Sequence, residues 1–281
     1  MDIISDPQQM QQRALAEKRA GRRVALVPTM GYLHAGHRSL LQEGRKRGDF
    51  LVLSLFVNPT QFGPSEDLST YPRDLEADLA LARAAGVDVV WTPTPQEVYP
   101  AGYATWVAVE GGLTTTLCGA SRPGHFRGVT TVVSKLFNVV QPDVALFGEK
   151  DFQQLAVIRQ MVRDLNFPIE IVGMPIVREA DGLAMSSRNV YLTPDQRRQA
   201  LVLSQALALA RELAAAGERE SATILATLRQ LIAAQPDARI DYLHICHQTT
   251  LQEQARIDAA AVLLLAVFIG KTRLIDNGFL L

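Results

Sequence analysis

The chain has 281 residues, of which 48% are hydrophobic and 20% are charged, and its formal net charge is −1. This length allows one large domain or two ordinary ones, and it is long enough to bury a core without disulfides or metals. A charge so close to zero argues against nucleic acid and against a membrane surface as the main partner.

The first 21 residues are polar and predict a helix rather than a signal peptide. The longest apolar run, residues 259–270, is shorter than the roughly 18 residues of a membrane span, and we interpret it as a buried strand. The two cysteines, Cys118 and Cys246, lie far apart in the sequence and have no metal-type spacing. They predict two reduced thiols in a cytoplasmic protein.

Strand-like and helix-like segments alternate from residue 22 to about residue 175. Apolar runs predict strands at 22–27, 50–57, 87–93, 104–109, 143–148 and 169–177. Helical spacing of apolar residues predicts helices at 37–48, 75–85, 129–140 and 152–164. This β-α-β alternation predicts an α/β fold: a Rossmann-like parallel sheet with right-handed crossovers and helices on both faces.

The pattern changes between residues 176 and 188. Thr193 is the expected N-cap and Pro194 the first residue of a long helix that runs to about residue 217. A second helix is expected at 221–234, followed by three strand-like runs at 238–245, 260–269 and 272–279. We therefore predict a domain over 1–184 and a small C-terminal α+β domain with an antiparallel sheet over 185–281.

The segment PTMGYLHAGH, residues 28–37, lies where the first long predicted strand passes into a helix. Ligands bind at such junctions in open α/β sheets. Gly31 and Gly36 allow the backbone to approach a ligand, and the N-terminus of the helix offers N–H groups to an anion. His34 and His37 can both donate hydrogen bonds to one phosphate group. A metal pair is the weaker alternative because no third ligand is evident, and two capping or surface histidines are a further one.

Two cations lie in other predicted loops at strand ends. Lys150 belongs to the sequence GEKD, and Arg188 to the sequence MSSRN. Both are side chains that bind phosphate, and an arginine can do so through two parallel hydrogen bonds. Taken alone, the first sequence could be a plain charged loop and the second a polar hairpin turn.

The segment at 28–37 resembles the HIGH motif of the nucleotidyltransferase superfamily, and its form is similar to that of the pantothenate synthetase family. The stretches 54–78 and 121–155 are similar to that family almost throughout. Residues 181–192 resemble the family's counterpart of the KMSKS loop of aminoacyl-tRNA synthetases, and TRLIDN at 272–277 also fits. The resemblance covers essentially the whole chain in the same order.

The resemblance implies an AMP-forming pantoate–β-alanine ligase, a carbon–nitrogen ligase of pantothenate and coenzyme A biosynthesis. Such an enzyme condenses (R)-pantoate with β-alanine, forming pantothenate, AMP and pyrophosphate from ATP through a pantoyl adenylate. A carboxylate does not react with an amine at neutral pH, and adenylation gives it a good leaving group. Alignment and electrostatic stabilisation are then the protein's main tasks. The resemblance also implies a homodimer, and Mg²⁺ that accompanies ATP.

The resemblance also assigns residues. Catalytic roles are expected for His34, His37, Lys150 and Arg188. The expected ATP-binding residues are Met30, Gly31, His34, Gly36, His37, Gly148, Glu149, Lys150, Asp151, Val177, Met185, Ser186, Ser187 and Arg188. The expected pantoate- and β-alanine-binding residues are Gln61, Gln154, Pro28, Met30, Asn58, Tyr71, Arg122 and His125. Gln61 and Gln154 carry amides, which both donate and accept, whereas Gln153 is expected to face solvent. The C-terminal domain is expected to act as a lid over the phosphates.

Some features depart from the family pattern or leave alternatives open. Tyr32 stands where smaller or amide residues are common, and Ala77 interrupts an acidic cluster between Glu76 and Asp78, so we assign no protein ligand to the metal. Another HIGH-type nucleotidyltransferase, such as a cytidylyltransferase or a synthetase-like adenylating enzyme, is the second candidate. A tRNA-binding enzyme would need a basic surface and an additional region for which this chain has no room. A nucleotide-binding protein that has lost catalysis is the third candidate.

Overall fold

The computed structural model describes residues 1–64 and 66–281. The chain forms two compact units. Unit 1 consists of Met1–Glu149 and Gln154–Pro175, and unit 2 consists of Lys150–Gln153 and Ile176–Leu281. Across the described ranges, none of the helices has the length and apolar character needed to span a membrane.

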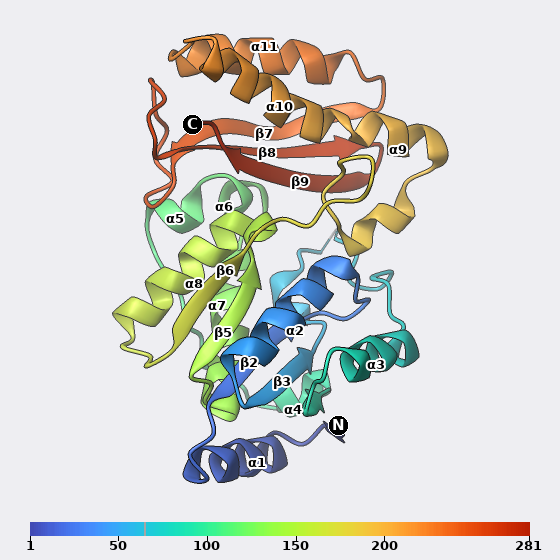
Figure 1. The fold of residues 1–281 in the computed structure, drawn as a ribbon, viewed down its shortest axis with the longest axis vertical. Helices are drawn as coiled ribbons and strands as arrows, with labels where there is room; N and C mark the ends of the chain where they lie inside the picture. The colour runs from blue at the N-terminus through green and yellow to red at the C-terminus, as the bar shows by residue number, and fades with distance from the viewer. Residues whose placement is uncertain (65) are drawn as a thin grey trace. The chain divides into compact units, whose positions relative to one another are not determined.

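Unit 1 is built on a six-stranded sheet in the order β1-β4-β3-β2-β5-β6, and every pairing is parallel (Figure 1). The strands are β1 (Asp2–Ile4), β2 (Val24–Thr29), β3 (Phe50–Leu55), β4 (Val89–Trp91), β5 (Val144–Gly148) and β6 (Glu170–Met174). The predicted Rossmann-like sheet is confirmed. Because all strands run the same way, the turns that follow β2, β3 and β5 lie at one edge of the sheet.

Helices cover both faces of this sheet. The longer ones are α1 (Pro7–Arg19), α2 (Ala35–Arg47), α3 (Leu75–Ala84), α7 (His125–Val140) and α8 (Phe152–Asp164). The shorter ones are η1 (Pro59–Gln61), α4 (Pro95–Val98), α5 (Gly112–Thr115), α6 (Cys118–Ser121) and η2 (Glu149–Asp151). Alternate residues of β2 belong to different cores: Leu26 packs with residues of α1 and α7, and Val27 packs with residues of α2 and α3. Burial on both faces explains why the central strands are continuously apolar.

Three details of unit 1 differ from the prediction. Residues 2–4, expected within a helix, form the edge strand β1, which pairs with β4. Residues 104–109 do not form a strand. The N–H of Val107 donates to Thr131 Oγ1 of α7 at 3.0 Å, so this backbone group bonds to a side chain and not to a neighbouring strand. Helix α7 begins at His125 rather than residue 129. Gly128 therefore lies inside the helix, and only glycine fits there, because a Cβ would be 2.4 Å from the Thr60 carbonyl oxygen.

Unit 2 contains a three-stranded antiparallel sheet in the order β7-β8-β9, as predicted. Its elements are η3 (Ser187–Tyr191), α9 (Pro194–Ala200), α10 (Val202–Ala215), α11 (Ser221–Ala233), β7 (Ala238–His247), β8 (Ala261–Ile269) and β9 (Thr272–Phe279). Helices α10 and α11 lie over the sheet and share one apolar core with it (Figure 1). Thr193 is the N-cap of α9, as expected, but the single long helix predicted here is two helices that meet at Leu201.

Candidate active site

The turn between β2 and α2 is held by a carboxylate from another helix. Gly31 and Tyr32 both have positive φ, 83° and 53°, which lets the chain reverse after β2. Asp78 of α3 accepts the N–H of Tyr32 at 2.8 Å through Oδ2 and that of Leu33 at 2.6 Å through Oδ1. A Cβ on Gly31 would lie 3.0 Å from Asp78 Oδ2. Burial raises the pKa of Asp78, which is 4% exposed. The Asp78 carboxylate therefore fixes the shape of this turn.

The two histidines of the turn cap α2. His34 is the N-cap residue, and its Nδ1 accepts the N–H of Gly36 at 3.2 Å. Nδ1 of His37 accepts the N–H of His34 at 3.3 Å, and the ring centroids are 4.1 Å apart. Since both Nδ1 atoms act as acceptors, each neutral imidazole carries its proton on Nε2. The capping role that was weighed as an alternative is thus real. It also orients two Nε2–H donors at the N-terminus of a helix, where anions bind.

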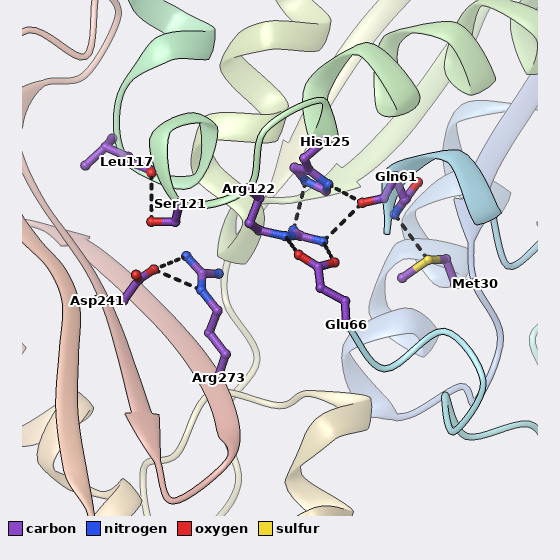
Figure 2. Close-up of polar contacts among 9 residues, drawn as sticks. All are labelled: Met30, Gln61, Glu66, Leu117, Ser121, Arg122, His125, Asp241 and Arg273. Atoms are coloured by element: carbon purple, nitrogen blue, oxygen red, sulfur yellow. Dashed lines mark hydrogen bonds and ion pairs between the residues drawn. The ribbon is translucent and has the colours of Figure 1, made fainter. Parts of the chain in front are cut away.

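Gln61, at the end of η1, has its amide orientation fixed by two neighbours. Asn58, which is 1% exposed, donates through Nδ2 to Gln61 Oε1 at 3.0 Å and to the Gly128 carbonyl at 3.2 Å. Gln61 Nε2 in turn donates to Met30 Sδ at 3.3 Å (Figure 2). The structure thus brings the predicted residues Asn58, Gln61 and Met30 together, and it turns the nitrogen of the Gln61 amide toward the β2–α2 turn.

Arg122 and His125 hold the backbone of Gln61 (Figure 2). His125 Nδ1 lies 2.9 Å from the Gln61 carbonyl oxygen and therefore donates to it, whereas His125 Nε2 accepts from Arg122 Nη1 at 3.0 Å. Arg122 also forms two 2.7 Å hydrogen bonds to the carboxylate of Glu66. Burial raises the pKa of Glu66, but the hydrogen bonds and the positive charge of Arg122, with smaller contributions from Gly63 and His125, together lower it by more, so this pKa is lowered overall. Arg122 and His125 were predicted to bind pantoate or β-alanine, and in this structure both contact the backbone carbonyl of Gln61.

The other predicted pantoate residues of unit 1 lie near this cluster or on the sheet. Tyr71 is 6% exposed and packs edge-to-face on Phe62, with ring centroids 5.9 Å apart. Pro28 lies within β2, opposite Ser54 of β3. Such positions suit apolar support of the turn. Substrate contact by either residue stays a prediction.

The prediction for the two neighbouring glutamines of α8 is wrong in part. Gln153 was expected to face solvent, but it is buried, with 4% exposure. Residues four apart lie on the same side of a helix, and Gln153 therefore continues the buried stripe formed by Val157 and Met161. Gln154 is partly exposed, as a substrate-binding residue must be. Gly148 and Glu149, at the carboxyl end of β5, are also partly exposed.

In unit 2, Val177 and Met185 lie side by side. The N–H of Met185 donates to the Val177 carbonyl at 2.9 Å, and Arg178 and Ala184 form an antiparallel bridge in the same hairpin. These two predicted ATP-binding residues are therefore adjacent although eight positions separate them in sequence. Asp151, which was predicted to bind ATP, is exposed, and its Oδ2 lies 3.7 Å from Lys150 Nζ.

The hairpin leads directly into the predicted phosphate-binding segment. Ser186 is the N-cap of η3, and its Oγ accepts the N–H of Arg188 at 3.3 Å. Ser187 is 7% exposed, whereas Arg188 is partly exposed. This segment is the start of a 3-10 helix rather than a polar hairpin turn, and it gathers N–H, hydroxyl and guanidinium donors within three residues.

A group of ion pairs supports the hairpin. Arg197 contacts the carboxylates of Glu179 and Asp181 at 2.8 and 2.6 Å. Asn189 donates to Glu179 Oε1 at 2.7 Å and to the Ala184 carbonyl at 3.1 Å. Hydrogen bonds from Arg197 lower the pKa of both carboxylates. The sequence did not assign these residues to the site, because their contacts form only when the hairpin folds and no sequence motif marks them.

Replacing Arg197 by glutamine is expected to lower the melting temperature at neutral pH, and the loss should fade in acid. A lowered carboxylate pKa stabilises the fold above the ordinary values of 4.5 for glutamate and 3.8 for aspartate, and this contribution disappears as pH falls through the lowered values. Thermal unfolding of both proteins between pH 7 and pH 3 measures the difference. Arg198→Gln is the control, because its ion pair with Asp195 is exposed. A gap that stays constant down to pH 3 would contradict this account.

The similarity of this chain to known proteins extends over nearly its whole length. The family described as "Pantoate-beta-alanine ligase" matches residues 2–279. Among relatives, the chain is 62% identical over 281 residues to the pantothenate synthetase of Syntrophotalea carbinolica, covering 100% of this chain and 99% of that protein. It is 60% identical over 277 residues to that of Trichlorobacter lovleyi, covering 99% and 98%.

Two solved structures are also similar to this chain. Pantothenate synthetase from Thermus thermophilus has a TM-score of 0.95 and 50% identity, with coverage of 100% of this chain and 99% of that chain. Pantoate-beta-alanine ligase from Francisella tularensis, complexed with beta-gamma ATP and beta-alanine, has a TM-score of 0.82 and 31% identity, with coverage of 99% and 97%. The similarity extends over both units.

Proposed function

The chain belongs to the pantoate–β-alanine ligase family, and we propose that His34, His37, Lys150 and Arg188 are the groups that carry out its reaction. The enzyme joins pantoate to β-alanine at the expense of ATP. The observation that carries this function is the family match across residues 2–279. The roles of individual residues rest on the geometry of each unit and on the chemistry that the reaction requires.

The proposed chemistry has two steps. A carboxylate oxygen of pantoate attacks the α-phosphorus of ATP, and the bond from that phosphorus to the pyrophosphate oxygen breaks. The amine of β-alanine then attacks the acyl carbon of pantoyl adenylate, loses a proton and expels AMP, which keeps one oxygen of the original carboxylate. Neither step needs a covalent bond to the protein. Alignment of anions and stabilisation of charge in the transition state are what the side chains must supply.

The histidine pair is assigned to the phosphates. Both Nδ1 atoms accept backbone N–H groups, so the Nε2–H groups of His34 and His37 are the donors that can meet phosphate oxygens. PTMGYLHAGH then acts as a HIGH-type motif, and Gly31 and Gly36 let the backbone approach the nucleotide. Asp78 acts through this turn by holding the N–H groups of Tyr32 and Leu33.

Lys150 and Arg188 are assigned to the same triphosphate. Lys150 supplies a point charge, and Arg188 supplies a planar fork that matches two phosphate oxygens. Ser186 and Ser187 add hydroxyl and backbone donors. The remaining nucleotide contacts are proposed for Met30, Gly148, Glu149, Asp151, Val177 and Met185.

Pantoate is assigned to Gln61 and Gln154, and β-alanine also to Gln61. The amide nitrogen of Gln61 suits an acidic or hydroxyl oxygen, since its amide oxygen already accepts from Asn58. Arg122 and His125 support this position through the Gln61 carbonyl. Pro28, Asn58 and Tyr71 complete the proposed surroundings.

Exchanging Gln154 for alanine is expected to raise KM for pantoate by about tenfold or more, because a hydrogen bond to a charged group is lost. KM for ATP should stay within about twofold of the original value, since one polar contact to pantoate changes only pantoate binding. Gln153→Ala is the matched control. It removes a buried polar side chain, so the melting temperature should fall while KM for pantoate stays unchanged. Initial rates at varied pantoate concentration and thermal unfolding measure both. The reverse pattern would exchange the roles of the two glutamines.

Magnesium is proposed to arrive with ATP rather than in a protein cage. In the described ranges 1–64 and 66–281, no group of three or more His, Cys, Asp or Glu side chains is arranged to hold a metal ion. Asp78, the carboxylate next to the histidine turn, already accepts two N–H groups. The described residues therefore do not fit a dedicated metal site.

The remaining assignments are also proposals. We propose a homodimer that works in the cytoplasm, where Cys118 and Cys246 would stay reduced thiols. The division into a nucleotide- and pantoate-binding domain over 1–184 and a lid over 185–281 stays a prediction. Light scattering after size-exclusion chromatography would measure the oligomeric state.

The adenylate intermediate is tested with pantoate labelled with ¹⁸O in its carboxylate. Attack on the α-phosphorus predicts one ¹⁸O in each AMP formed, detectable by mass spectrometry. If all the label remained in pantothenate and solvent, the carboxylate would not have attacked the α-phosphorus. Unlabelled pantoate in ¹⁸O-enriched water is the control for exchange of oxygen with the solvent.

A further inference from the structure

Strand β9 carries two adjacent polar residues that are almost fully buried. Asp276 is 2% exposed and Asn277 is 7% exposed. Burial of polar side chains is unfavourable unless each finds hydrogen-bond partners. We therefore expect both side chains to form specific hydrogen bonds that offset the cost of their burial.

Asn277 holds the backbone of Lys150. Its Nδ2 donates to the Lys150 carbonyl oxygen at 3.0 Å. The ring of Phe152 also packs edge-to-face on Phe279 of the same strand, with centroids 6.0 Å apart. These contacts explain why residues 150–153 form part of unit 2, although the strand that precedes them belongs to unit 1.

Asp276 holds the hairpin that precedes the Ser186–Arg188 segment. Arg178 donates to both of its carboxylate oxygens, at 2.7 Å from Nη1 and 2.9 Å from Nη2, and Nη1 also donates to the Gly182 carbonyl at 3.1 Å. Asp276 Oδ1 accepts the N–H of Asn277 at 2.8 Å as well. A paired, buried carboxylate of this kind fixes both its own strand and the loop that it meets.

Successive side chains of a strand point to opposite faces, so one dipeptide can reach two different segments. We propose that Asp276 and Asn277 are positioning residues that hold Lys150 and the Ser186–Arg188 segment in fixed register on β9. The inference rests on the proposed roles of Lys150 and Arg188 as phosphate-binding cations. A small displacement of such groups is costly, since alignment contributes a large part of the catalytic effect.

The test is a double-mutant cycle on the rate of pyrophosphate release in a single turnover with ATP and pantoate. Asn277→Ala should slow this step about tenfold or more in the normal enzyme. In the Lys150→Ala background the same change should have an effect of less than about twofold, because the group that it positions is gone. Asp276→Asn should likewise slow pyrophosphate release in the normal enzyme, and it should have an effect of less than about twofold in the Arg188→Ala background.

Thr272→Ala is the matched control, since Thr272 lies on the same strand with 8% exposure. It should leave the rate unchanged. Thermal unfolding of every variant separates loss of positioning from loss of fold. If Asn277→Ala does not fold, Asn277→Asp, which keeps the size and lacks the Nδ2 donor, takes its place in the cycle.

An equal slowing by Asn277→Ala with and without Lys150 would overturn the inference and leave the proposed function intact. Full activity of Lys150→Ala would remove the proposed role of Lys150, and the inference would fail with it. Slowing that depends on Lys150, with an unchanged melting temperature, supports the inference.

Discussion

Replacing Lys150 by alanine is expected to slow AMP formation by about a hundred- to a thousandfold, the usual effect of removing one preorganised group that stabilises transition-state charge. The Lys150 side chain is 21% exposed and its Nζ lies 3.7 Å from the exposed carboxylate of Asp151, so its removal should cost little stability. Steady-state rates with saturating pantoate and β-alanine, at varied ATP, measure the loss.

Lys271→Ala is the control for this experiment, because Lys271 is an exposed lysine of the same unit. It should match the original enzyme in rate and melting temperature. Lys150→Arg keeps the charge but changes its shape, and partial activity is expected from it. A Lys150→Ala enzyme within about threefold of the original rate would show that this lysine is a surface residue.

Substituting asparagine for His37 should lower the same rate about a hundredfold or more while the fold keeps its stability. The two functions of the ring can be separated, because Nδ1 caps the His34 N–H and Nε2 is the proposed phosphate donor. The Oδ1 atom of asparagine can replace Nδ1 as the capping acceptor, but nothing in asparagine replaces the Nε2–H group. Alanine at position 37 would lose both functions.

The measurement is a pair of rates and unfolding free energies for His37→Asn and His37→Ala. Both variants should be slow, and only His37→Ala should lose stability, by about 1 kcal/mol. His34→Asn gives an independent copy of the experiment, since His34 Nδ1 caps Gly36 in the same way. A fast His37→Asn enzyme would mean that this histidine serves only as a cap.

The sheet was predictable because parallel strands that are buried on both faces consist of continuous runs of apolar residues. The predicted runs at 22–27 and 50–57 correspond to strands β2 (Val24–Thr29) and β3 (Phe50–Leu55), which pack on both faces. Short edge elements carry too little pattern: β1 has three residues, and its pairing with β4 depends on a segment more than eighty positions away. The run at 104–109 shows the opposite error, since apolar alternation there serves packing on α7.

The site was predictable where one motif holds its residues together. His34, Gly36 and His37 form their capping contacts within four positions. The supports of the site were not predictable in this way. Asp78 reaches the turn from 45 positions away, and Asn277 reaches Lys150 from 127 positions away. Gln153 differs from Gln154 only in the direction that it faces on α8, which depends on where that helix begins.

The most direct test of the account is a single turnover with ATP, Mg²⁺ and pantoate in the absence of β-alanine. Adenylation as a separate first step predicts about one pyrophosphate released per active site, followed by AMP and pantothenate when β-alanine is added. No pyrophosphate before β-alanine is added would contradict a free-standing adenylation step and would require both bonds to be made in one complex.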